Sequence, residues 1–120
     1  MLSVMRLWLG IAAVNGALAV AAGAFAAHGL RARLGIDMLA AWETGARYHM
    51  YHALAMGLAA LWGSRWSSTF FLTGIVLFCG SLYALALSGL GWLGVVTPFG
   101  GALLIAGWVC LAISSFRKTA

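Results

Sequence analysis

The chain has 120 residues, of which 64% are hydrophobic and only 8% are charged, whereas soluble domains carry roughly a quarter charged residues. This composition excludes an ordinary water-soluble domain. The formal charge of +5 does not indicate a nucleic-acid partner, because the cations stand at the ends of apolar runs and not in a patch with interleaved aromatic side chains.

The first apolar segment is long enough to cross a bilayer. Leu7 to Ala27 contains about 21 residues, or roughly 31 Å as a helix, which matches the hydrocarbon thickness. Ala24-Phe25-Ala26 imitates a signal-peptide cleavage site, but the apolar run is too long for a signal peptide. We therefore predict a membrane helix over residues 7–28.

The second segment combines polar and apolar residues. Residues 29–36 carry two arginines and interrupt the apolar sequence. The helix that follows, predicted over residues 38–63, begins before it enters the membrane. Glu43 and Arg47 are four residues apart on its first turns, and this spacing predicts an interfacial salt bridge.

Two further spans complete the predicted bundle. Residues 64–67 form a short polar turn, after which residues 68–88 are apolar enough for a third membrane helix. Thr97 and Pro98 have the pattern of an N-cap followed by proline at the first helical position. The fourth helix is therefore predicted over residues 98–116.

These segments predict an all-α, polytopic membrane protein, a four-transmembrane-helix bundle that forms one domain over residues 1–120 and contacts the lipid bilayer. Strands are excluded because no run alternates polar with apolar residues. The positive-inside rule places both termini in the cytoplasm. The cations on the terminal side are Arg6, Arg65, Arg117 and Lys118, and those on the other side are Arg31, Arg33 and Arg47, offset by two acids.

Small residues recur at a four-residue period, as helices packed in lipid require for close approach. These rows predict tight helix packing within the bundle or with another chain. The rows are Ala19, Gly23 and Ala27; Ala55, Ala59 and Gly63; Gly80, Ala84 and Ser88; and Ala102, Ala106, Cys110 and Ser114.

Four strings resemble a known family: GAFAAHGL at 23–30, ETGARYHMYHALA at 43–55, LFCGSLYALALSG at 77–89 and TPFGGALLIAGW at 97–108. The chain resembles the YgdD-like family of small bacterial inner-membrane proteins, a domain of unknown function with a eukaryotic transmembrane counterpart. The resemblance implies a four-helix membrane protein and carries no established activity or catalytic residue. In one departure, the family usually has glutamine where this chain has His49.

Polar groups inside the hydrocarbon are costly, so each needs a partner and is a candidate for function. His49 and His52 are three residues apart, about 60° around the helix axis. With His28 they could form a three-imidazole cluster for metal, haem or protons, but we favour histidines hydrogen-bonded between helices and predict no cofactor. The candidate functional polar cluster is Asn15, His28, Glu43, Arg47, His49, His52, Ser81 and Tyr83.

Three kinds of function follow from these features. The favoured hypothesis is a non-enzymatic helix-packing module that acts as a homo-oligomer or as an accessory subunit of a larger membrane complex. The alternative is a small-solute or proton-linked transporter or channel that uses a mid-membrane polar layer of Asn15, His52, Ser81 and Tyr83. An enzyme or redox carrier that uses the histidines would require a bound metal or haem.

Overall fold

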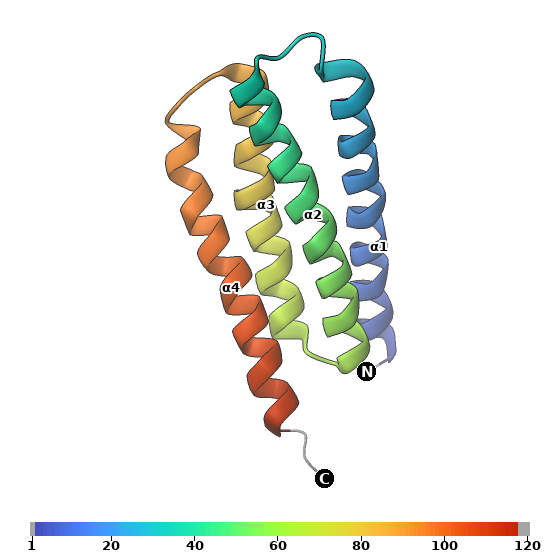
Figure 1. The fold of residues 1–120 in the computed structure, drawn as a ribbon. Coiled ribbons are helices and arrows are strands. Elements are labelled where there is room, and N and C mark those ends of the chain that lie inside the picture. Colours follow the sequence, from blue (N-terminus) through green and yellow to red (C-terminus); the bar gives the residue numbers. More distant parts are fainter. Residues whose placement is uncertain (1, 118–120) are drawn as a thin grey trace.

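The computed structural model describes residues 2–117, which form four long α-helices and one short π-helical segment and contain no strand. Successive helices run in opposite directions, so that the start of α1 and the end of α4 lie at the same end of the molecule (Figure 1). The predicted all-α membrane bundle is confirmed. The elements are α1 (Leu2–Phe25), η1 (Ala26–Leu30), α2 (Ile36–Trp62), α3 (Arg65–Ser88) and α4 (Leu93–Arg117).

Three of the described helices are long and apolar enough to cross a membrane: Leu2–Leu30, Arg65–Ser88 and Leu93–Arg117. The remaining helix, α2, is as long, with 27 residues, but it is more polar because it carries both acids, Arg47 and two histidines. It lies between α1 and α3 and packs against both. Neighbouring helices therefore shield the most polar helix of the bundle.

The helices stand in chain order from α1 to α4 (Figure 1). α3 packs against α2 and α4, whereas α4 does not pack closely against α1. Only 17% of the most apolar stretch of α1, and the same share in α4, is buried in the protein, compared with 39% in α3. The bundle is thus open between its first and last helices, which present most of their apolar surface to lipid.

The helices extend beyond the predicted spans. α1 begins at Leu2 and not at residue 7, and α3 begins at Arg65 and not at residue 68. Hydrogen bonding keeps the backbone helical past the end of the apolar sequence, where the side chains enter the polar interface. Lys118, which the sequence places among the cations of this end, lies outside the described residues.

The prediction that Thr97 caps the fourth helix is wrong. α4 begins at Leu93, and Pro98 lies inside the helix. Two turn-type hydrogen bonds lead into α4. Leu93 N–H donates to Leu90 O at 3.1 Å, and Val95 N–H donates to Trp92 O at 3.0 Å. Proline removes one backbone donor, and near the beginning of a helix only the carbonyl four residues earlier, that of Gly94, loses its helical partner.

α1 ends in the π-helical segment Ala26–Leu30. A Cβ added at Gly29 would lie 2.5 Å from the Phe25 ring, so glycine makes room for this ring. One turn before the π-helical segment, the Ala22 carbonyl accepts a hydrogen bond of 2.8 Å from Trp42 Nε1 of α2. The indole thereby fastens the end of α1 to α2 where the helix widens.

Glycines on facing surfaces let α3 and α4 approach closely. A Cβ at Gly100 would overlap the backbone nitrogen of Phe78, and a Cβ at Gly107 would lie 2.6 Å from the Phe71 ring. On α3, a Cβ at Gly74 would lie 2.6 Å from the Leu104 side chain. The α3–α4 contact therefore depends on these glycines and on the phenylalanine rings beside them.

Much of the predicted small-residue pattern lies outside these contacts. Ala19, Ala55 and Ala59 are buried as expected. Gly80, Ala106, Cys110 and Ser114 are half-buried, and the remaining six positions are exposed. The exposed members of the predicted rows are Gly23, Ala27, Gly63, Ala84, Ser88 and Ala102.

We expect Gly100→Ala to destabilise the bundle by about 1–3 kcal/mol, because the new methyl group must displace the α3 backbone. Gly101→Ala is the matched control, since its Cβ would meet the Phe78 ring at an ordinary 3.6 Å. Stability can be measured in detergent as the temperature at which the buried Cys79 thiol becomes reactive. Equal stability of the two variants would contradict the close approach of Gly100 to the Phe78 backbone.

Candidate functional site

A chain of polar side chains crosses the interior from α1 through α2 to α3. Asn15 Oδ1 lies 2.9 Å from His49 Nε2, and His49 Nδ1 lies 3.0 Å from the Tyr83 hydroxyl oxygen. Asn15 is 8% exposed and His49 is 6% exposed. Three of the predicted candidate residues are thus brought together at one place, and they link three helices.

The direction of each hydrogen bond follows from the groups involved. Asn15 Nδ2 donates to Ile11 O at 2.9 Å, which turns its carbonyl oxygen towards His49. That oxygen can only accept, so His49 Nε2 carries the proton, and Nδ1 of the neutral ring accepts from the Tyr83 hydroxyl. The three side chains satisfy one another with a neutral imidazole.

His52 points towards α4 instead. Its Nδ1 donates to Tyr48 O at 2.7 Å, and its Nε2 accepts from Trp108 Nε1 of α4 at 3.1 Å. The fully buried Phe71 ring packs against both His52 and Trp108, with centroids 5.8 and 5.2 Å away. His52 therefore connects α2 to α4, whereas His49 connects α2 to α1 and α3.

Ser81 makes a separate link between α3 and α4. Its hydroxyl oxygen lies 2.6 Å from Thr97 Oγ1, and the Ser81 hydroxyl also donates to Phe78 O at 2.9 Å. Either hydroxyl can donate in the Ser81–Thr97 contact, and the Thr97 hydroxyl also donates to Leu93 O at 3.4 Å. Ser81 is 6% exposed, so the pair is shielded near the beginning of α4.

Packing fixes the Tyr83 ring in place. A Cβ at Gly45 would lie 2.9 Å from the ring, so the glycine leaves room for it. Trp42 covers another side, with ring centroids 4.5 Å apart. These contacts hold the tyrosine hydroxyl against His49 without contributing to the hydrogen bond itself.

The other three candidates lie away from this interior network. His28, Glu43 and Arg47 are exposed. The predicted salt bridge between Glu43 and Arg47 is not formed. The two side chains line the same surface groove, but the Glu43 carboxylate and the Arg47 guanidinium lie farther apart than an ion pair. Long side chains at a membrane boundary gain more from water or headgroups than from an exposed pair.

The three histidines do not converge. His28 is exposed at the end of α1, while His49 and His52 are bonded to side chains of different neighbouring helices. Within residues 2–117, no group of three or more histidine, cysteine or acidic side chains could hold a metal ion. In the same part of the chain, every buried side-chain nitrogen and oxygen has a hydrogen-bond partner. The arrangement therefore acts as a set of cross-links between helices.

The sequence matches the family model described as "Protein of unknown function (DUF423)" over residues 22–101. The UPF0382 membrane protein YwdK of Bacillus subtilis is 37% identical over 121 residues, which cover 94% of this chain and 98% of YwdK. The UPF0382 inner membrane protein YgdD of Escherichia coli is 42% identical over 119 residues, which cover 93% of this chain and 91% of YgdD.

This chain belongs to the DUF423 family. The predicted resemblance to YgdD-like proteins is confirmed, and the relatives' description as membrane proteins agrees with the apolar helices found here. No solved structure matches the chain significantly.

Sequence reasoning missed two partners in the DUF423 bundle, Trp108 and Thr97. Trp108 carried a usable signal, because it lies about two turns inside its span whereas tryptophan prefers the interface. An indole N–H at membrane depth needs an acceptor, and His52 supplies it. Thr97 gave no such signal, since its position before Pro98 favoured a capping role.

We expect His49→Leu to destabilise this DUF423 protein by about 1–2 kcal/mol, because it leaves Asn15 and Tyr83 without partners at membrane depth. His49→Gln should retain most of the stability, since its amide offers one donor and one acceptor. His28→Leu makes the same change at an exposed site and is the control. Thermal unfolding in detergent measures all three, and equal effects of the two leucine variants would contradict the assigned hydrogen bonds.

Proposed function

We propose that this protein is a non-catalytic helix-packing module of the membrane that acts as a homo-oligomer or as an accessory subunit of a larger membrane complex. The observation that carries the proposal is the complete internal pairing of the buried polar side chains of residues 2–117. His49 and His52 use both ring nitrogens in hydrogen bonds within the protein. Neither ring is free to take a proton from a substrate.

The outer surface supports association with other helices. Several small residues of the predicted rows are exposed on α1, α3 and α4, among them Gly23, Ala84 and Ala102. A Cβ at Gly23 would meet no atom within 4 Å. Because small residues let membrane helices approach closely, the side of α1 that carries Gly23 is the surface we assign to contact with another chain.

The same proposal places the protein in the inner membrane with both termini in the cytoplasm. The start of α1 and the end of α4 lie at one end of the bundle (Figure 1), and Arg6, Arg65 and Arg117 belong to that end. The positive-inside rule favours the cytoplasm for this end. Both acidic residues belong to α2 near the opposite end.

Transport through a mid-membrane polar layer has weaker support. Two imidazoles at membrane depth favour it in principle, because such groups mark proton and solute paths. Here Asn15 and Tyr83 are bonded to His49, and Ser81 is bonded to Thr97. A conducting path would have to break these contacts to admit water or a solute.

Purification in lipid nanodiscs followed by native mass spectrometry tests the packing proposal. We expect a homo-oligomer or a stoichiometric membrane partner, and Gly23→Ile should reduce its recovery by blocking close approach. Leu18→Ile is the control, because Leu18 is 54% exposed and its side chain is already large. A purely monomeric protein without any recovered partner would overturn the proposal. Proton flux in proteoliposomes that is abolished by His49→Leu but retained in His49→Gln would favour transport instead.

A further inference from the structure

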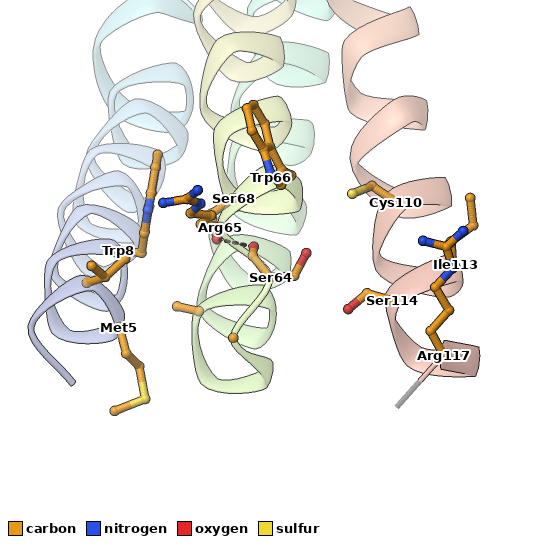
Figure 2. A pocket seen from close by; sticks show the side chains of 13 residues that line it. Met5, Trp8, Ser64, Arg65, Trp66, Ser68, Cys110, Ile113, Ser114 and Arg117 are labelled. Atoms are coloured by element: carbon orange, nitrogen blue, oxygen red, sulfur yellow. Dashed lines mark hydrogen bonds between the residues drawn. The ribbon is translucent and has the colours of Figure 1, made fainter. Parts of the chain in front are cut away.

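A pocket of about 700 Å³ lies at the end of the bundle where α1 begins and α4 ends. Its walls come from α1 and α4, and the turn between α2 and α3 contributes its base. Figure 2 shows Trp8 on one wall, Cys110 and Ser114 on the other, and Ser64 between them. The pocket exists because α4 packs against α3 and not closely against α1.

Two arginines line this pocket from different helices. Arg65 is the first residue of α3 and Arg117 is the last of α4, and both are exposed. The chain has only two acidic residues, Asp37 and Glu43, and they belong to the beginning of α2 at the other end of the bundle. No acidic side chain of this chain therefore lies near the two guanidinium groups, which leaves them available to an anionic ligand.

The remaining lining is amphipathic. Met5 and Trp8 of α1 and Ile113 of α4 provide apolar surface, and Ser114 brings a hydroxyl group next to Arg117 on the α4 wall. Trp8 and Cys110 lie further from the chain termini than Met5 and Arg117 (Figure 2). Figure 2 shows the Arg65 side chain on the side of Trp8 and the Arg117 side chain beside Ile113 of α4, so the two cations lie on the two walls of the space between α1 and α4.

We propose that this pocket binds one anionic glycerophospholipid, with its phosphate between Arg65 and Arg117 and an acyl chain between α1 and α4. Guanidinium groups bind phosphate oxygens in a planar, two-pronged geometry, and basic pockets between transmembrane helices hold lipid head groups. A zwitterionic lipid brings its own cation and neutralises the arginines less well. This assignment is independent of the proposed packing function.

Native mass spectrometry of protein released from nanodiscs tests the lipid assignment. We expect a retained phosphatidylglycerol adduct and little phosphatidylcholine adduct, with Arg65→Gln/Arg117→Gln lowering the former about tenfold or more. Arg31→Gln/Arg33→Gln removes the same charge from two exposed arginines at the other end. This control should change the amount of phosphatidylglycerol adduct less than about twofold. Equal losses in the two double variants, or no preference over phosphatidylcholine, would overturn the proposal.

A second variant separates a shaped pocket from surface charge. Ser114→Phe keeps both arginines but fills the space between the walls, so it should also lose the adduct. Ile105→Phe, at a site on α4 that is 65% exposed, is the matched control. An adduct that survives Ser114→Phe, or that millimolar inorganic phosphate displaces, would overturn the assignment to a whole lipid.

The native cysteines provide a check in the folded protein. Cys110 lines the pocket, whereas Cys79 is 1% exposed. Phosphatidylglycerol should slow the labelling of Cys110 by N-ethylmaleimide relative to phosphatidylcholine, while Cys79 should stay unlabelled in every correctly folded variant. Equal Cys110 labelling in the two lipids would contradict the proposed position of the acyl chain.

Discussion

The need to satisfy polar side chains away from water organises this bundle around α2. His49 and His52 are only about 60° apart around the axis of that helix, yet the partners of His49 come from α1 and α3 and the side-chain partner of His52 comes from α4. An unsatisfied imidazole in hydrocarbon would cost more than its hydrogen bonds return, since bonds between membrane helices contribute only about 0.6 kcal/mol on average. The polar helix therefore lies inside, and the more apolar α1 and α4 face lipid.

Glycines make this polar network sterically possible. Gly45 leaves space for the Tyr83 ring beside His49, and Gly107 lets α4 approach Phe71 so that Trp108 reaches His52. Small residues and hydrogen bonds thus depend on each other, because an indole or a phenol can find its acceptor only where the backbones come close. The same coupling explains why a single methyl group at Gly100 is expected to disturb the bundle.

Packing α4 on α3 alone has a consequence at the terminal end. α1 and α4 separate there, and the space between them is lined by Arg65 and Arg117 without a neighbouring carboxylate. At the opposite end Glu43 and Arg47 occur together on α2. Among residues 2–117 the two ends therefore differ in charge, and the terminal end combines a pocket with cations that have no acidic side chain nearby.

The sequence by itself determined the membrane class, the existence of the four helices and most of the polar residues of the interior. Long apolar runs, and polar residues within them, can be recognised from the order of the residues alone. It identified Asn15, His49 and Tyr83 as candidates but not their order of contact. The start of α4 at Leu93, the choice of Gly100 and Gly107 as the close contact, and the divergence of His49 from His52 required the tertiary structure. These features depend on how the helices rotate and cross, and helix rotation in lipid is decided by side-chain packing between segments far apart in the chain.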